Sequence, residues 1–292
     1  MSMTVTVSDW QDAPQLDSGG EAVFAIGDAH GLSGHLAALR DRLADSAAQL
    51  QGVPTRLVQV GDVIDGGPDS AGTVALVTSK QWGEGFGASH VLIGNHEILM
   101  RLSLAAANAA GLSIVWRAWT GSGGDAALKS FGIAEDGEGE DLQPLVRERA
   151  GAVLEDFFAR LETHVLIGNL VIVHAGIDPT EDAEEMQRFL EKSWEELPRP
   201  GPGGDHHWAW IREALLSWNG PARSGRIVVH GHTPESKVKK RMGDRYPGPH
   251  VLNELRLGID AGSWRTGRLA AAQLENGRYR IFIAEGPVPG RG

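Results

Sequence analysis

The sequence predicts an α/β fold in a single domain, and three observations lead to this prediction. Short apolar segments typical of buried strands alternate with segments whose apolar residues recur at helical spacing. A polar motif containing glycine follows each of the first three apolar segments, as expected where a strand turns into a helix. The 292 residues are 41% hydrophobic and 22% charged, which is typical of a globular domain with a full core.

The first part of the chain is expected to contain a flexible leader over residues 1–20, which is polar with acids and glycines, followed by one folded domain over residues 21–292. The apolar segment 22–26 predicts the first strand. Ser33 is a candidate cap for the next helix, because leucines recur at helical spacing after it.

Two further strand–helix pairs continue this pattern. Segment 55–60 predicts a strand and 69–79 a helix, and the same order repeats in 89–93 and 97–110. Strands joined by helices form parallel sheets, which bind ligands beyond the carboxyl ends of their strands. The polar motifs at these ends are therefore expected to lie together.

Strands dominate the predictions for the second half of the chain. Segment 165–173 contains a Gly168-Asn169 pair, which predicts a hairpin with a two-residue turn. Segment 226–229 predicts another strand. Segments 255–260, 268–274 and 279–284 predict a closing β meander.

Segments between these elements predict loops. Segment 135–141 is acidic and glycine-rich, and 198–204 is rich in proline and glycine. His206 and His207 follow the second loop and are expected to be solvated rather than to bind metal. The basic run 237–241 predicts a solvated turn or hairpin, and the alternative is a basic lip of a substrate cleft.

Composition narrows the classes of function. The formal net charge is −11 and no wide basic region occurs, so nucleic-acid binding is not expected. The chain has no cysteine, which excludes disulfides, thiolate nucleophiles and cysteine zinc sites within it. Apolar runs fall short of the ~20 residues of a membrane helix, and residues 1–20 do not resemble a signal peptide. We therefore expect a cytoplasmic protein with no membrane partner.

Five short polar motifs follow apolar segments of the chain. Each alone is weak, because Asp and Asn are common turn and capping residues. Together they supply the oxygen and imidazole ligands that divalent metal ions prefer. The motifs are Gly27-Asp28-Ala29-His30-Gly31, Gly61-Asp62-Val63-Ile64-Asp65, Gly94-Asn95-His96-Glu97, His174-Ala175-Gly176 and Gly231-His232-Thr233.

The spacing of these residues predicts a site for two metal ions. Asp28 and His30 are two residues apart, so one tight turn can direct both to the same ion. Asp62 can bridge two ions through its two carboxylate oxygens. The candidate ligands that complete the coordination of the second ion are Asn95, His174 and His232.

His96 is the candidate proton donor. It follows Asn95 directly and therefore lies near the second ion while pointing away from it, which suits protonation of a departing alkoxide. Asp65 could orient and hold the protonated imidazole. The alternative for Asp65 is to cap the following helix.

The five motifs, in this order, resemble those of the calcineurin-like metallophosphoesterase superfamily. Within it, the chain resembles the phosphoprotein phosphatase branch, including its bacterial members and the related symmetrical diadenosine-tetraphosphate hydrolases. The resemblance extends over about residues 23–274 and includes the segments 66–70, 121–132, 210–212, 230–234 and 259–262.

The resemblance implies an α/β (α+β) fold built as a β-sandwich of mixed sheets flanked by helices. It also implies two divalent ions, often manganese, iron or zinc, and direct attack of a metal-bound hydroxide on phosphorus. The implied metal ligands are Asp28, His30, Asp62, Asn95, His174 and His232. The implied general acid is His96 with Asp65, and the implied phosphate-binding residues are Arg212, Asn95 and His96. For Arg212 the alternative is packing on neighbouring tryptophans.

Two positions distinguish between branches of the family. Pro234 stands where many phosphodiesterase branches carry a second histidine, so one ion has one protein ligand fewer, as in the phosphatase branch. Glu97 fits the protein-phosphatase type, whereas the dinucleotide hydrolases tend to carry Asp there.

Gly66 departs from the family pattern, because an arginine that helps hold the phosphate usually stands at this position. Losing a charge-assisted phosphate contact weakens transition-state stabilisation. Either the substrate differs, or activity is low, or another cation substitutes. The candidates for that cation are Arg101, Arg117 and the region around Lys239.

These features predict a dinuclear-metal phosphomonoester hydrolase, with a serine/threonine protein phosphatase as the first hypothesis. Its substrate would be a phosphorylated protein or a small phosphoester. The alternative is a symmetrical diadenosine-tetraphosphate hydrolase. A lesser alternative is a metal-binding scaffold whose catalysis weakened with the missing arginine.

Overall fold

Strands that are apolar on both faces form the centre of the larger of two sheets. The computed structural model describes residues 3–289 except 107, 134–136, 138 and 195–205, so the loop predicted at 198–204 lies outside the described residues. The larger sheet has eight strands in the order β1-β12-β11-β3-β4-β5-β6, with β2 paired to β12. These are β1 (Thr4–Val7), β2 (Gln11–Asp12), β3 (Ala22–Ile26), β4 (Thr55–Gln59), β5 (Ala88–Leu92), β6 (Leu161–Glu162), β11 (Arg268–Glu275) and β12 (Arg278–Glu285).

The smaller sheet packs face to face against the larger one. Its order is β10-β9-β8-β7, and its strands are β7 (His164–Ile167), β8 (Leu170–Val173), β9 (Ile227–His230) and β10 (Arg256–Gly258). Val23 and Val58 of the larger sheet and Ile172 and Val229 of the smaller one belong to one buried apolar cluster. Burying this surface holds the two sheets together as a sandwich.

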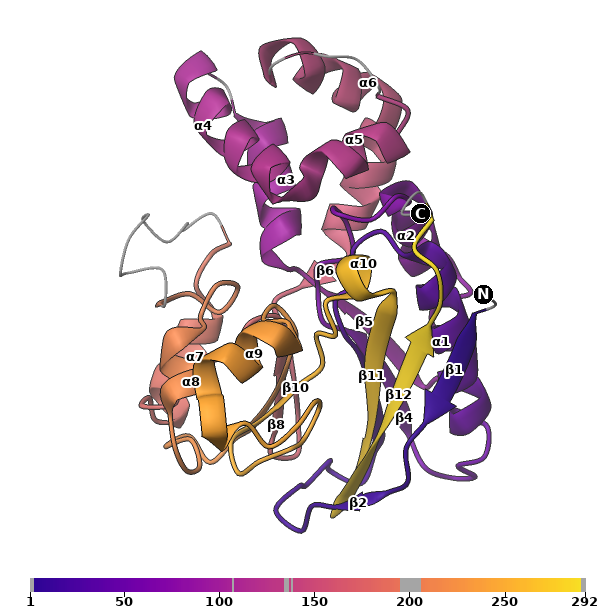
Figure 1. Ribbon diagram of the computed structural model, residues 1–292, viewed down its shortest axis with the longest axis vertical. Coiled ribbons are helices and arrows are strands. Elements are labelled where there is room, and N and C mark those ends of the chain that lie inside the picture. Colours follow the sequence, from indigo (N-terminus) through magenta and orange to yellow (C-terminus); the bar gives the residue numbers. More distant parts are fainter. Residues whose placement is uncertain (1–2, 107, 134–136, 138, 195–205, 290–292) are drawn as a thin grey trace.

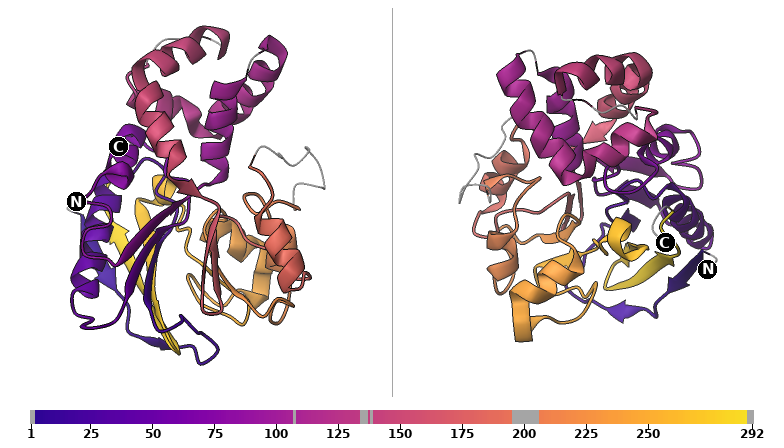
Figure 2. Two further views of the ribbon diagram at one scale, coloured as in Figure 1. Left: turned by 180° about the vertical axis from the view of Figure 1, so that it is seen from behind. Right: turned by 45° about the horizontal axis from the view of Figure 1, so that its top comes forward.

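Helices cover the outer faces of the sandwich (Figures 1 and 2). The first two pack on the larger sheet, and the next four form a lobe at the top of Figure 1. These are α1 (Ser33–Ala47), α2 (Ser70–Thr78), α3 (Asn95–Ala105), α4 (Ala109–Trp119), α5 (Asp125–Ser130) and α6 (Gly139–Ala159). The remaining helices are α7 (Ala183–Leu190), α8 (Glu213–Ser217), α9 (Glu235–Met242) and α10 (Ser263–Thr266). The predicted fold, one domain with mixed sheets flanked by helices, is confirmed. None of the described helices is both long enough and apolar enough to cross a membrane.

The N-terminal segment corrects one prediction. Within the predicted leader, β1 pairs with β12 along its whole length, with Thr4 opposite Glu285 and Val7 opposite Phe282. Leu16 is also buried. Residues 1–20 are polar on average, so the short alternation of Thr and Val within them was not recognised as a strand. Such an alternation suits an edge strand.

Three further elements differ from their predictions. The basic run lies in α9, so the prediction of a turn or hairpin was wrong, and its three C-terminal cations stabilise the helix end. Strand β10 pairs with β9 in the smaller sheet and not with the meander. Ser33 is the first residue of α1, and the residue at the cap position is Leu32.

His207 is buried, in contrast to the prediction of a solvated side chain, whereas His206 is exposed. The ring of His207 packs against Trp208 and Trp210, with centroids 4.7 and 5.1 Å away. Its Nδ1 accepts a hydrogen bond from the backbone N–H of Ala209 at 3.0 Å, which requires an unprotonated nitrogen. Burial lowers the pKa of His207 to about 4.

Acid is therefore expected to destabilise the protein through His207. The folded-state pKa lies below the ordinary value of 6.5, so the unfolded state binds the proton first. The stabilising contribution is complete above pH 6.5 and is lost as the pH falls toward 4. Between pH 7 and 4.5, the free energy of unfolding in urea should fall by ~2 kcal/mol less in His207→Gln than in the wild type. His206→Gln is the control, and identical pH profiles for His207→Gln and the wild type would contradict this assignment.

Candidate metal centre and active site

The polar side chains of all five motifs meet at one edge of the sandwich. Strands β3, β4 and β5 are parallel, as are β8 and β9, so the loops after them emerge at the same ends of the two sheets. Asp28, Asp62 and Asn95 follow strands of the larger sheet, whereas His174 and His232 follow strands of the smaller one. The site therefore forms only where the two sheets pack together.

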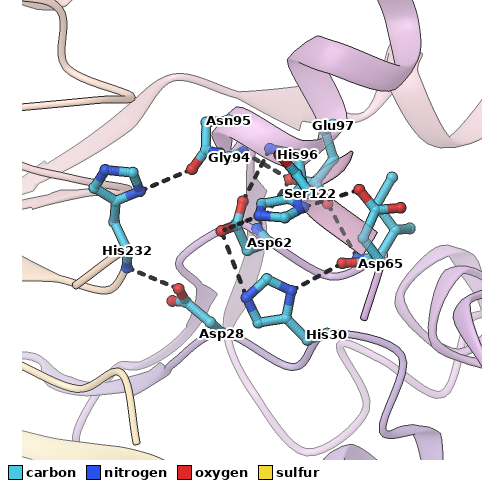
Figure 3. Close-up of polar contacts among 12 residues, drawn as sticks. Asp28, His30, Asp62, Asp65, Gly94, Asn95, His96, Glu97, Ser122 and His232 are labelled. Atoms are coloured by element: carbon cyan, nitrogen blue, oxygen red, sulfur yellow. Dashed lines mark hydrogen bonds and ion pairs between the residues drawn. The ribbon is translucent and has the colours of Figure 1, made fainter. Parts of the chain in front are cut away.

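Asp62 lies at the centre of this group and is 2% exposed. Its Oδ1 lies 3.3 Å from Nε2 of His174, and its Oδ2 lies 3.7 Å from Nε2 of both His30 and His96 (Figure 3). Burial would raise the pKa of Asp62, but His174 and His96 hold it well below its ordinary value. Asp62 is therefore a carboxylate with its two oxygens directed to different imidazoles.

Potential ligands form two groups that share Asp62. One contains His30, Asp62 and His96, and the other contains Asp62, His174 and His232, with one ligand atom of each residue within 4.8 Å of the others. Asn95 joins the second group, because its Oδ1 lies 3.0 Å from Nε2 of His174 and 2.7 Å from Nδ1 of His232.

Three imidazoles are oriented as metal-binding histidines require, with one nitrogen donating to a backbone carbonyl. The donors are Nδ1 of His30 to Ile64 at 3.1 Å, Nδ1 of His174 to Val60 at 2.9 Å and Nε2 of His232 to Trp210 at 3.3 Å. The other nitrogen of each ring faces Asp62 or Asn95. Burial lowers the pKa of His30 to about 4 and holds that of His232 well below its ordinary value. Neutral imidazoles are the form that binds metal.

Asp28 adds a buried carboxylate oxygen to the site. Its Oδ2 accepts a hydrogen bond of 2.7 Å from the backbone N–H of His232, whereas Oδ1 has no hydrogen-bond partner among the described residues. Burial raises the pKa of Asp28 well above its ordinary value, and the charges of Asp260 and Asp62 add to this effect. A buried, unsatisfied oxygen among other carboxylates suits a cation. The residues present therefore fit divalent metal ions.

Asp65 binds the Nδ1 side of the His96 ring. Nδ1 of His96 donates to Oδ2 of Asp65 at 2.9 Å, and the indole N–H of Trp119 donates to both oxygens of Asp65 at 3.1 and 3.0 Å. Asp69 rather than Asp65 caps α2. Burial alone would lower the pKa of His96, but Asp62 and Asp65 raise it to about 9. These two carboxylates therefore favour the protonated form of His96.

A cavity of about 370 Å³ lies over these residues. Arg212 reaches it from the start of α8, and its Nη2 donates to the backbone oxygen of His232 at 3.2 Å. The lining residues are His30, Asp62, Asn95, His96, Leu99, Ser122, Trp210, Arg212, His232, Pro234, Lys237, Asp260, Gly262, Trp264 and Arg265.

The backbone at the site is held in an unusual conformation. His30, Asp62, Asp65 and His232 have positive φ angles of 45°, 51°, 72° and 65°. Residues other than glycine rarely adopt this region, and such strain concentrates where surrounding structure fixes functional side chains. Sequence reasoning had no signal for this strain beyond the adjacent glycines.

Glu97 organises the site, a role that sequence reasoning missed. Its carboxylate accepts hydrogen bonds from the backbone N–H groups of Asp62, Val63, Ile64 and Gly94 at 2.8–3.2 Å. Burial raises the pKa of Glu97 to about 7, and the charge of Asp62 adds to this. Its place three residues after Gly94, at the start of a helix, is a capping-box signal that could have indicated the role.

Asp260 is a second residue that sequence reasoning left without a role. It lines the cavity and is 3% exposed. Its Oδ1 accepts a hydrogen bond from the backbone N–H of Gly262 at 2.8 Å, and burial raises the pKa of Asp260 to about 6. The only signal in the sequence that pointed to Asp260 was its place in segment 259–262, which is part of the family resemblance.

Removal of the Glu97 carboxylate is expected to destabilise the fold, because four buried N–H groups lose their acceptor. At pH 8, where Glu97 is charged, Glu97→Ala should lower the free energy of unfolding by ~3 kcal/mol or more. Urea unfolding followed by circular dichroism measures this change. Glu254→Ala, at an exposed carboxylate, is the control. A loss below ~1 kcal/mol for Glu97→Ala would show that the loops do not depend on this acceptor.

Comparison with known proteins places the chain in a family. The model of the calcineurin-like phosphoesterase family matches residues 22–261. Serine/threonine-protein phosphatase 1 of Salmonella typhimurium (strain LT2) is 28% identical over 254 residues, which cover 87% of this chain and 92% of that protein.

Solved structures of similar fold include a cold-active protein-tyrosine phosphatase of a psychrophilic Shewanella species. It is 16% identical, with a TM-score of 0.51 and coverage of 92% of this chain and 80% of that one. A structure proposed to be a diadenosine tetraphosphatase is 22% identical, with a TM-score of 0.48 and coverage of 93% and 96%. The family match, joined to a site built for divalent ions, shows that the chain belongs to the calcineurin-like phosphoesterase family and is a metal-dependent phosphoester hydrolase.

Proposed function

We propose that this protein is a two-metal phosphomonoester hydrolase that acts on phosphorylated serine or threonine in proteins. The observation that carries the proposal is the position of His96, which is held by Asp65 and lines the same cavity as two ligand groups that share Asp62. The likeness to a serine/threonine-protein phosphatase over most of both chains supports this choice of substrate.

The two groups, together with the buried Asp28, support an assignment of the metal ligands. We assign Asp28, His30 and Asp62 to one ion, and the second ion would be held by Asp62, Asn95, His174 and His232. When bound, two divalent ions supply an activated water and neutralise charge on the phosphoryl oxygens. His96 lies within the first group, but its Nδ1 is held by Asp65, and proton donation uses the remaining nitrogen.

The residues around the cavity orient the phosphate and donate the proton. Arg212 and Asn95 orient the phosphate, with Arg212 supplying positive charge. His96 gives the proton on Nε2 to the departing oxygen of serine or threonine. Asp65 keeps the other nitrogen protonated, and Trp119 fixes Asp65.

The alternative substrate is a symmetrical dinucleotide tetraphosphate. The cavity contains Trp210 and Trp264 beside Arg212, Lys237 and Arg265, a combination that suits an aromatic, polyanionic molecule. The third hypothesis, a scaffold with weak catalysis, is not favoured, because the chain belongs to a hydrolase family. A cytoplasmic location, and manganese, iron or zinc as the ions, remain predictions.

The direct test compares two substrates after metal reconstitution. A phosphothreonine peptide and diadenosine tetraphosphate are supplied at matched enzyme concentration, and released phosphate or nucleotide is quantified. We expect kcat/KM to be at least about tenfold higher for the peptide. Preference for the dinucleotide would replace the proposed function with the alternative, and absence of turnover of either substrate would contradict both.

Variants of the His96–Asp65 pair test the mechanism in the same assay. His96→Asn should lower kcat about 10²–10⁴-fold. Asp65→Asn should lower it less, because the imidazole remains but loses its orientation. Metal content, measured by mass spectrometry, should stay unchanged in His96→Asn, and His206→Asn is the exposed control. Unchanged turnover in His96→Asn would remove His96 from the reaction.

A further inference from the structure

The structure explains why an arginine does not fit at position 66. Gly66 has a φ of 76°, which favours glycine. A Cβ at this position would lie 2.8 Å from Cδ2 of Trp264, and the Gly66 N–H donates to the Gly123 oxygen at 3.0 Å. The ring of Trp264 and the backbone of Gly123, in the π-helical segment Thr120–Gly124, thus both lie close to Gly66. The space beside Gly66 is therefore filled by the tryptophan and is not available to a substrate.

The cations suggested from the sequence as replacements lie mostly elsewhere. The guanidinium of Arg101 stacks over the rings of Phe158 and Trp194, at 5.7 and 3.9 Å from their centroids. Neither Arg101 nor Arg117 is among the residues that line the cavity, within the part of the chain that the structure describes. The basic run contributes one lining residue, Lys237.

Lys237 of α9 and Arg265 of α10 line the cavity together with Arg212 and His96. Both side chains are exposed at the rim, and among the described residues neither forms an ion pair. Arg265 stacks on Trp264, with its guanidinium 4.6 Å from the ring centroid. The tryptophan that fills the space beside Gly66 therefore also positions a cation at the mouth of the same cavity.

The charges of these cations act on one another. Partial desolvation lowers the pKa of Lys237, the positive charges of Arg212 and Arg265 add to this, and the charge of Asp260 opposes it. Repulsion among neighbouring cations raises the free energy of the ligand-free site, and a phosphate dianion relieves this repulsion. Because the whole chain carries a net charge of −11, a local cluster of cations also helps to attract an anionic substrate.

We propose that Lys237 and Arg265 form a phosphate clamp opposite Arg212 and make the contact that Gly66 cannot supply. The clamp rests on the proposed function, because it holds the phosphoryl group that this hydrolase cleaves. It assigns Trp264 as a positioning residue, which acts through Arg265. The basic run thus contributes to the substrate cleft through a single residue.

The test measures phosphate affinity in two ways. Lys237→Ala, Arg265→Ala and the double variant are compared with wild type for KM with p-nitrophenyl phosphate and for competitive inhibition by inorganic phosphate. We expect each single variant to raise KM and the inhibition constant about fivefold, and the double variant about 30-fold, with smaller changes in kcat. Lys239→Ala, on the same helix but outside the cavity lining, is the matched control.

An exchange variant separates the clamp from general damage to the cavity. In the Trp264→Ala/Arg265→Ala background, the space beside Gly66 is open, so adding Gly66→Arg should recover part of the lost phosphate affinity, while the φ of 76° at this position still opposes a side chain. The same Gly66→Arg change in the wild type should not improve affinity, because it collides with Trp264. Improvement of phosphate affinity by Gly66→Arg in the wild type would overturn the role given to Trp264.

Calorimetric titration of inorganic phosphate into metal-loaded protein distinguishes failure of the clamp from failure of the proposed function. Weaker binding in the double variant than in wild type supports the clamp even where no monoester is turned over. Equal binding by wild type and the double variant, or no binding by wild type, overturns the clamp. Turnover by a double variant with wild-type KM also overturns the clamp and leaves the proposed function intact.

Discussion

Burial of the Asp62 carboxylate is the constraint on which the rest of the site depends. A charge with 2% exposure must be compensated, and three imidazoles converge on its two oxygens. Two of these, His30 and His96, come from the larger sheet and one, His174, from the smaller. The apolar core between the sheets therefore sets the distances among ligands, and any slip in sheet packing would separate them.

The loops that carry the site are held by polar groups that are not among the residues lining the cavity. Glu97 joins the loop after β4 to the start of α3 through four N–H groups. Trp119, from the helical lobe, fixes Asp65. The positive φ angles at four site residues are stable because these bonds and the surrounding packing impose them. Rigid support of this kind keeps catalytic groups in place before substrate arrives.

The sequence predicted the elements whose signals are local. Strand, polar motif and helix follow one another within about 15 residues, so the motifs, their order and the fold class could be inferred. Contacts between distant segments that carry no such motif could not be inferred. No residue near Gly66 in the sequence indicates its contact with Trp264, which lies nearly 200 residues later. Likewise, no residue near His207 indicates that its ring is buried against tryptophans. Strand β1 was missed for the same reason, because its partner β12 lies at the other end of the chain.

The central claim is that Asp62 is shared by two metal ions, and anomalous X-ray diffraction tests it most directly. Crystals grown with manganese would be measured above and below the manganese absorption edge. The account predicts two anomalous peaks ~3.5–4 Å apart, one on each side of the Asp62 carboxylate, with His30 beside one and His174 beside the other. A single peak, or two peaks that do not contact Asp62, would contradict it.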